Sequence, residues 1–129
     1  MTIKIYPLVS SLHDSNVVDN STKEFLNALE LKIGCSFEIE RNIGNLYKDC
    51  DFSLLLIQTG GSENYFLRDI NKIKSPISLL TYGFSNSLAA AIEILSYINQ
   101  HDLKGEILHG STDYVSKRIL ELMGVKTND

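Results

Sequence analysis

The sequence has no cluster of basic residues. Its 12 lysine and arginine residues are scattered over 129 positions and are outnumbered by 16 acidic residues, which gives a formal net charge of −4. Proteins that bind nucleic acid normally carry a basic stripe that neutralises phosphates. We therefore expect no nucleic acid partner, and acidity of this size mainly favours solubility.

The sequence also has no long apolar run. No stretch approaches the roughly 18 consecutive apolar residues that a membrane span needs. The first residues lack the basic segment and the apolar run that make up a secretory signal. We therefore expect no membrane partner and a cytoplasmic location.

Cysteine is scarce. Cys35 and Cys50 do not have the short spacing of a metal-binding pair, and without an export signal we expect both to be free thiols. No group of His, Asp and Glu residues has metal-ligand spacing either. The sequence therefore predicts no metal site in this chain.

What the sequence does contain is a regular alternation of short apolar segments and segments of helical periodicity. The residues 52–58 include an uninterrupted apolar run, as expected of a central strand covered on both faces. Pro7 counts against a strand at the start of the chain, because proline cannot donate to a sheet. The motif Ser21-Thr22-Lys23-Glu24 predicts a capping box at a helix start, and Gly34 a helix end. The predicted strands cover residues 3–9, 36–41, 52–58, 76–80 and 105–108, and the predicted helices cover residues 21–33, 63–73, 87–100 and 113–123.

Strands that alternate with helices favour a parallel sheet with right-handed crossovers. We expect residues 1–129 to form a single α/β domain, a flavodoxin-like three-layer sandwich with a five-stranded parallel sheet in the order 2-1-3-4-5. In such a sheet, ligands bind beyond the carboxyl ends of the strands.

Polar and small residues gather in the loops at these strand ends. After the third strand, two glycines allow close approach to the main chain, and the following helix start offers amides to a hydroxyl, carboxylate or phosphate group. The same turn could equally be an ordinary strand-to-helix connection that Ser62 caps. The residues expected to contact a ligand are Thr59, Gly60, Gly61, Ser62, Glu63, Asn86 and His13.

The histidines offer a different chemistry. His13 and His109 follow the first and fifth strands, and a serine such as Ser11 or Ser111 could act as a nucleophile beside either. The first and fifth strands are not neighbours in the expected order, so a joint site is disfavoured and ordinary loop hydrogen bonds are the simpler interpretation. His101 is expected to be a solvated residue at a helix end. We assign no catalytic residue.

Several known chemistries lack their residues. A phosphoacceptor domain needs an acidic residue after the third strand, where the sequence reads Ile57-Gln58-Thr59. A flavodoxin needs a glycine-containing phosphate loop after the first strand, where the sequence reads Ser10-Ser11-Leu12-His13-Asp14. Neither a dinucleotide fingerprint nor a P-loop is present.

Three segments together resemble the amino-terminal domain of the L-fucose/L-arabinose isomerase-like family. In that family an apolar strand ends in a threonine-glycine-glycine-threonine-glutamate turn, then come a proline-led strand and a helix that opens with asparagine-serine-leucine-alanine. Here Ser62 stands for the second threonine. The loop with His13 is also similar to that of arabinose isomerases, with Leu12 where they have a glutamine. The segments are Leu54-Leu55-Leu56-Ile57-Gln58-Thr59-Gly60-Gly61-Ser62-Glu63, Pro76-Ile77-Ser78-Leu79-Leu80 and Asn86-Ser87-Leu88-Ala89-Ala90-Ala91-Ile92-Glu93.

The resemblance implies a domain of an aldose–ketose sugar isomerase that is not catalytic alone. Such a domain helps the enzyme to oligomerise and lends loop residues to a substrate pocket, while a divalent metal such as manganese binds in domains absent from this sequence. The chain would then be an isolated or truncated amino-terminal piece, with further copies or complementary isomerase domains as partners. Two alternatives are a stand-alone module that binds a sugar or sugar phosphate, and a small enzyme that uses His13 or His109 as acid or base.

Overall fold

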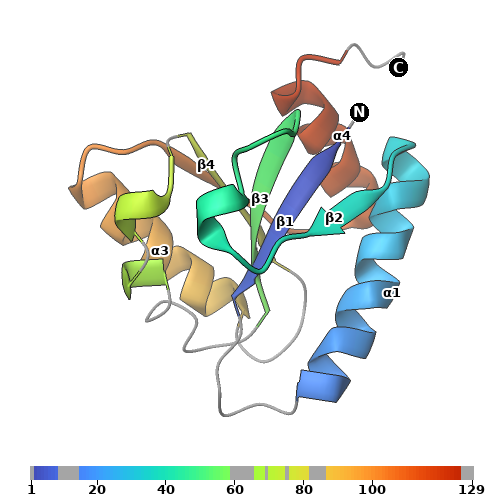
Figure 1. Cartoon of the computed structure of the whole chain (residues 1–129), viewed down its shortest axis with the longest axis horizontal. Helices are drawn as coiled ribbons and strands as arrows, with labels where there is room; N and C mark the ends of the chain where they lie inside the picture. The colour runs from blue at the N-terminus through green and yellow to red at the C-terminus, as the bar shows by residue number, and fades with distance from the viewer. Residues whose placement is uncertain are drawn as a thin grey trace.

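The computed structural model describes residues 2–8, 15–58, 66–68, 70–74, 76–81 and 87–125, without the side chains of residues 15–22. Strands and helices alternate along this part of the chain, and two short 3-10 helices, η1 and η2, occur in the connections (Figure 1). The elements are β1 (Ile3–Leu8), α1 (Ser15–Ile33), β2 (Phe37–Ile39), η1 (Ile43–Asn45), β3 (Phe52–Ile57), η2 (Ile70–Lys72), β4 (Ile77–Thr81), α3 (Ser87–Gln100), β5 (Gly105–Leu108) and α4 (Thr112–Leu122).

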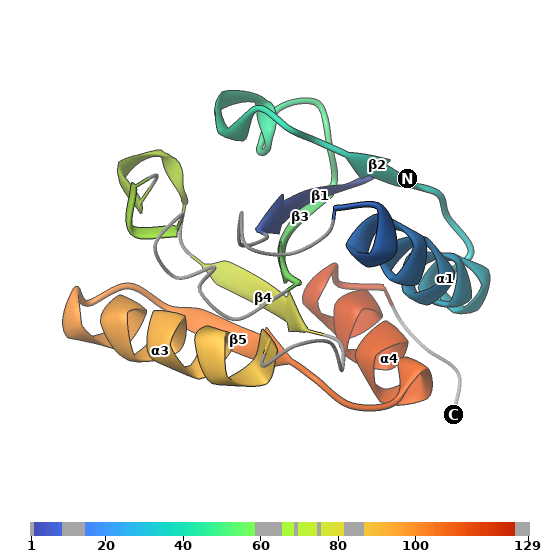
Figure 2. The ribbon, with the colours of Figure 1, turned by 90° about the horizontal axis from the view of Figure 1, so that it is seen from below.

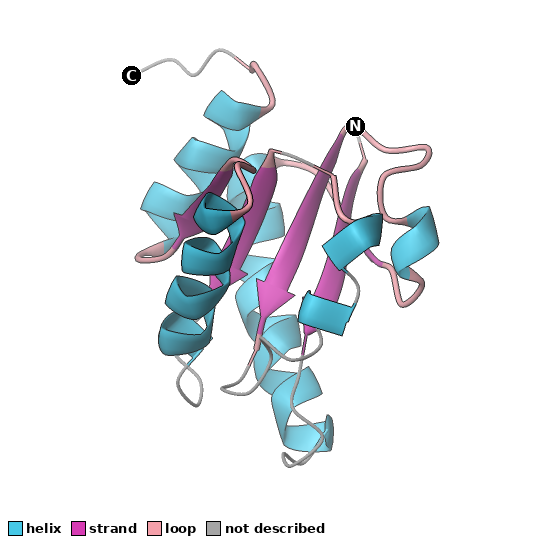
Figure 3. Cartoon of the chain, turned by 90° about the vertical axis from the view of Figure 1, so that its left-hand side faces the viewer, coloured by secondary structure: helices cyan, strands magenta, loops and turns pink. Residues whose placement is uncertain are grey.

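The strands form one five-stranded sheet in the order β2-β1-β3-β4-β5, and every neighbouring pair is parallel (Figure 3). This is the flavodoxin-like order that the sequence predicted. The connection from β1 leads to β2 on one side of the sheet, whereas the connections from β3 onward lead to β4 and β5 on the other side. The strand order therefore reverses between β1 and β3.

Helices cover both faces of the sheet, which makes a three-layer α/β fold (Figure 2). One apolar cluster lies between the sheet and helices α1 and α4, and the other lies between the sheet, α3 and the segments around η1 and η2. Side chains of β3 alternate between them: Leu54 and Leu56 belong to the first cluster, and Leu55 and Ile57 to the second. The central apolar run thus packs on both faces, as predicted.

Pro7 is tolerated inside β1 because of the way the ladder ends. The N–H of Glu40, the residue after β2, donates to the Ile5 carbonyl (2.8 Å). On the other side of β1, the Gln58 N–H donates to the Leu8 carbonyl (2.9 Å). Odd-numbered residues of β1 therefore direct their peptide groups toward β2, and even-numbered residues toward β3. Because β2 ends at Ile39, opposite Ile5, Pro7 lies just beyond the stretch of β1 that pairs with β2, and it is on that side that its N–H is missing.

The first helix begins earlier than predicted. Helix α1 starts at Ser15, so Ser21 lies well inside it and the predicted capping box is wrong. Residues 15–20 contain neither proline nor glycine, so the sequence does not interrupt a helix that begins upstream of Ser21. The predicted end is confirmed: Gly34 has a φ of +84°, and its N–H donates to the Glu30 carbonyl (2.8 Å).

The predicted helix over residues 63–73 is not one continuous α-helix in the described part. Residues 66–68 are helical, but Ile70–Lys72 form the 3-10 helix η2, in which the Ile73 N–H donates to the Ile70 carbonyl (3.2 Å). The tighter winding suits a short connection that ends just before Pro76. The two ends of the segment are anchored by Phe66 and Ile73, which are both buried in the α3-side cluster.

Candidate functional site

All of the ligand-contact residues predicted from the sequence lie outside the described residues. This holds for Thr59, Gly60, Gly61, Ser62, Glu63, Asn86 and His13. The strands that lead into their loops are nevertheless described. β1, β3 and β4 are neighbours and run in parallel, so all three end at the same edge of the sheet. We call this the carboxyl edge.

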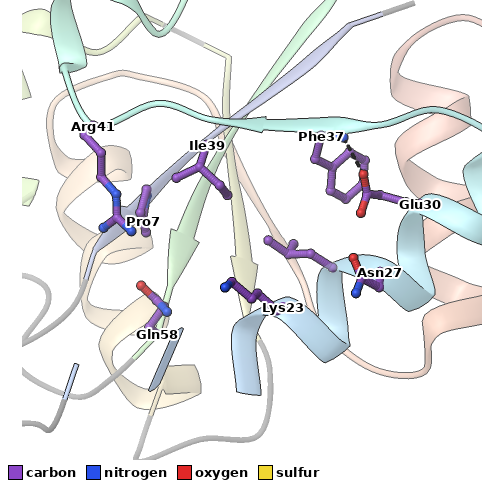
Figure 4. A pocket seen from close by; sticks show the side chains of 9 residues that line it. Pro7, Lys23, Asn27, Glu30, Phe37, Ile39, Arg41 and Gln58 are labelled. Atoms are coloured by element: carbon purple, nitrogen blue, oxygen red, sulfur yellow. Dashed lines mark hydrogen bonds between the residues drawn. The ribbon is translucent and has the colours of Figure 1, made fainter. Parts of the chain in front are cut away.

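A cavity of about 410 Å³ lies at this edge, beneath β2 and beside α1 (Figure 4). Pro7 near the end of β1 and Gln58 directly after β3 form its inner wall, so it adjoins the point where the strand order reverses. Open α/β sheets bind their ligands in this crevice, and small-molecule sites have volumes of about 300–1,000 Å³. Its lining consists of Pro7, Lys23, Leu26, Asn27, Glu30, Phe37, Ile39, Arg41 and Gln58.

The polar side chains of this cavity come from three parts of the chain. Lys23 and Asn27 project from α1, Arg41 follows β2, and Gln58 follows β3. Figure 4 shows the Arg41 guanidinium, the Gln58 amide and the Lys23 side chain extending toward a common space. Gln58 is almost completely buried although its side chain is polar. The lining therefore includes two cationic side chains and two amide side chains beside its apolar residues.

Glu30 is the acidic residue of the cavity lining, and its carboxylate already has a structural task. Its Oε2 accepts a hydrogen bond from the Phe37 N–H of β2 (2.8 Å). This bond draws the carboxylate toward the α1–β2 junction, away from Arg41 and Gln58 (Figure 4). The lining as a whole, with Lys23 and Arg41 against Glu30, carries a formal excess of one positive charge. An anionic group is therefore favoured at the Arg41 end.

A second cavity, of about 390 Å³, lies at the opposite edge of the sheet. It is lined in part by Ser53, at the start of β3, and by Pro76, just before β4. Tyr47 also lines it, and burial raises the pKa of its hydroxyl. The amino ends of parallel strands are not where open sheets bind ligands, so the cavity at the carboxyl edge is the stronger candidate.

His109 lies at the carboxyl edge, directly after β5. Its Nδ1 forms a hydrogen bond with Thr81 Oγ1 at the end of β4 (2.6 Å). Ser111, which the sequence offered as a possible nucleophile, instead caps α4: its Oγ accepts the Tyr114 N–H (3.1 Å). β1 and β5 are separated by two strands, as expected, which disfavours a joint site of their histidines. His101 is exposed and stacks on Tyr97, in agreement with the expectation of a solvated helix end.

The sequence did not single out Lys23, Asn27, Arg41 or Gln58 as a site. Lys23 was attributed to a helix cap, and Arg41 to the end of an edge strand. Only Gln58 carried a recognisable signal, because it is a polar residue directly after an apolar run that becomes a central strand. Nothing in the local pattern could relate residues of a helix to residues of strands that pack against it later in the chain.

Both cysteines are free thiols, as predicted. Burial raises the pKa of Cys35, which disfavours its reactive thiolate form. Within the described ranges, no three His, Cys, Asp or Glu side chains are grouped as a metal site would require. The helices that are described include none with the length and apolar character to cross a membrane.

Together, the sheet order and the cavity define an open, doubly wound α/β domain of flavodoxin-like type with a polar crevice at its carboxyl edge. No protein-family model matches the chain, and the search of curated proteins found no match. The chemistry of the crevice is therefore the basis for a function.

Proposed function

We propose that this chain binds a small polyhydroxylated anion, a sugar phosphate or an acidic sugar, in the cavity between α1, β2 and the carboxyl ends of β1 and β3. The observation that carries the proposal is the convergence of Lys23, Arg41 and Gln58 on one space at the point where strand order reverses. Guanidinium groups bind phosphate and carboxylate oxygens in a bidentate manner. Amides such as those of Asn27 and Gln58 donate to and accept from hydroxyl groups.

The apolar part of the lining supports the same ligand class. Pro7, Leu26 and Ile39 give the cavity a surface without hydrogen-bonding side chains, against which the carbon face of a sugar ring can pack. The polar side chains beside these apolar ones can fix the orientation of a ligand through directional hydrogen bonds, as in other small-molecule sites. A neutral, purely apolar ligand would offer no hydrogen-bonding group to the polar side chains of this lining.

The resemblance to sugar isomerases suggests a larger enzyme in which this binding site would act. In that hypothesis the domain holds or shields part of the sugar, and the metal-dependent aldose–ketose step takes place on other domains or subunits. The sheet order is compatible with the hypothesis, but the turn Thr59-Gly60-Gly61-Ser62-Glu63 and the residue Asn86 lie outside the described residues. The isomerase role, the homo-oligomer and the complementary domains therefore stay predictions.

Isothermal titration calorimetry against pentoses, hexoses, their phosphates and inorganic phosphate tests the binding site. We expect a phosphorylated or acidic sugar to bind, and Arg41→Gln to weaken it by roughly tenfold or more, as for the loss of a charge-assisted hydrogen bond. Lys23→Gln should weaken binding less, because an ammonium group cannot form the bidentate hydrogen bonds of a guanidinium group.

Lys72→Gln is the matched control. It removes the same charge from η2, which lies on the other face of the sheet, so affinity should not change. Circular dichroism and thermal unfolding establish that each variant is folded. The proposal is wrong if no compound of the panel binds, or if Arg41→Gln binds as tightly as the original chain.

A further inference from the structure

Helix α1 presents a row of polar side chains to the cavity of the proposed function. Lys23, Asn27 and Glu30 all line the cavity, and their spacing of four and three positions places them along one face of the helix. The row begins with a cation and ends with a carboxylate two turns later, about 10 Å along the helix axis. The charge presented by α1 therefore changes sign from one end of the cavity to the other.

Strand β2 and the residues after it show which end is which. Phe37 and Arg41 both line the cavity and are four positions apart along this segment. The Phe37 N–H donates to Glu30 Oε2 (2.8 Å), which joins the carboxylate end of the α1 row to the beginning of β2. Arg41 lies at the other end of the lining, as Figure 4 shows. The cavity therefore has a carboxylate at one end and a guanidinium group at the other.

The carboxylate of Glu30 is held in place and keeps acceptor capacity for a further partner. Its hydrogen bond to Phe37 uses one oxygen, whereas an ionised carboxylate has about four acceptor positions on its two oxygens. The bond anchors the side chain between the two elements that line the cavity, so a ligand has less side-chain entropy to remove on binding. Glu30 is also half-buried, so water screens its charge less than that of a surface glutamate.

We propose that the ligand of this cavity carries an ammonium group in addition to its anionic group, as an amino-sugar phosphate does. The phosphate group meets Arg41, and the ammonium group meets the carboxylate of Glu30. An ammonium group donates to a carboxylate and also attracts it as an opposite charge, whereas a hydroxyl group only donates. This inference rests on the proposed function and narrows its ligand class to sugars that carry both charges.

The charges of the lining agree with a ligand of this kind. Lys23 and Arg41 against Glu30 leave the lining with a formal excess of one positive charge. A phosphate monoester carries about 1.5 to 2 negative charges near pH 7, so a plain sugar phosphate brings more negative charge than the lining balances. An ammonium group reduces the net charge of the ligand to about −0.5 to −1, which is close to the charge of the lining with the opposite sign.

A pyranose ring separates the two groups in the way that the cavity requires. In glucosamine 6-phosphate the amine is on carbon 2, and the phosphorylated carbon is attached to carbon 5, which is the opposite position of the ring. The phosphate and the ammonium group therefore lie on opposite sides of the sugar. Ile39 lines the cavity between Phe37 and Arg41, where the carbon face of the ring can pack.

Isothermal titration calorimetry with glucosamine 6-phosphate and glucose 6-phosphate tests the ammonium contact, because the two compounds differ only in the group on carbon 2. We expect the amino compound to bind about tenfold more tightly, as for one additional charge-assisted hydrogen bond. Glu30→Gln should reduce this ratio to about twofold or less, because the amide retains an acceptor for the Phe37 N–H but has no charge.

Glu24→Gln is the matched control. It removes the same charge from an exposed position of α1 that does not line the cavity, so the ratio of the two affinities should stay at its original value. The inference is overturned if the two compounds bind equally, if Glu30→Gln leaves the ratio unchanged, or if neither binds while another sugar phosphate does. In each of these cases the proposed function stands as long as Arg41→Gln weakens the binding. If no sugar phosphate or acidic sugar binds, both fail.

Discussion

Arg118 links α4 to the edge strand β5 through hydrogen bonds and an ion pair. Its Nε and Nη2 donate to the two carboxylate oxygens of Glu106, each at 2.6 Å, and its Nη1 donates to Glu121 (3.0 Å). These hydrogen bonds stabilise the charged form of Glu106 and hold its pKa below the ordinary value. Both partners are about one-third exposed, so solvent weakens the pair.

We predict that Glu106→Gln lowers the Tm by a few degrees at pH 7 and that this difference closes in acid. A carboxyl whose pKa is lower in the folded than in the unfolded chain contributes stability above the unfolded value, about 4.3, and loses it as the pH falls through the folded value. Thermal unfolding from pH 7 down to pH 3 measures the difference. Glu93→Gln, an exposed glutamate on α3, is the control and should follow the original chain throughout. A constant gap for Glu106→Gln at all pH values would contradict the pairing.

At the scale of the elements, β2 is a short edge strand, and one of its outward-facing backbone N–H groups already donates a hydrogen bond to a side chain. Glu38 and Glu40 direct their peptide groups toward β1, as the bond from Glu40 N–H to Ile5 shows, so Phe37 and Ile39 direct theirs outward. The outward Phe37 N–H donates to Glu30 of α1. Exposed strand edges are templates for pairing between chains, and this carboxylate blocks one position of the template.

We predict that Glu30→Ala lowers the free energy of unfolding by about 1 kcal/mol, the usual net value of a lost hydrogen bond. It should also raise self-association, because the Phe37 N–H becomes available to another strand. Urea unfolding and sedimentation velocity over a range of concentrations measure the two effects. Glu30→Gln keeps an acceptor oxygen, so it should retain most of the stability and should not raise self-association as Glu30→Ala does. Equal sedimentation of all three proteins would rule out the edge-blocking role.

The same element accounts for a gap in the prediction of the site. The sequence correctly predicted an edge strand near residues 36–41, and the structure confines it to Phe37–Ile39. Arg41 falls just beyond this shorter strand and is one of the cavity residues. Strand ends depend on where pairing with the neighbour stops, and the partner, β1, is more than thirty positions away in the sequence.

At the scale of the whole molecule, the layers predict a gradient of stability across the sheet. β3 lies at the centre and is packed on both faces, whereas β2 is three residues long and pairs on one side. Native-state hydrogen exchange should therefore be slowest for Leu55 and Leu56, by about 100-fold or more relative to the hydrogen-bonded Glu40 amide. Similar exchange rates at the centre and at the edge would show that the sheet opens only as a unit.

The sequence by itself determined the order of elements and, through it, the fold. The apolar pattern of a strand or helix, such as the run in residues 52–58, is visible in a short stretch of sequence. Parallel strands joined by helices then allow few topologies. Local signals were less reliable where packing competes with them. Ser21 has the chemistry of a helix cap, but neither proline nor glycine interrupts the helix upstream of it, and α1 begins at Ser15.

Only the tertiary structure decided which side chains share a space. Lys23, Arg41 and Gln58 are separated by long stretches of chain, and they line one cavity because α1 packs along one face of the sheet. The bond between Thr81 and His109 likewise exists only because β4 and β5 pair in one register. The physical reason is that periodicity is a property of neighbouring residues, whereas a site is made by contacts that form only when distant elements close on a common core.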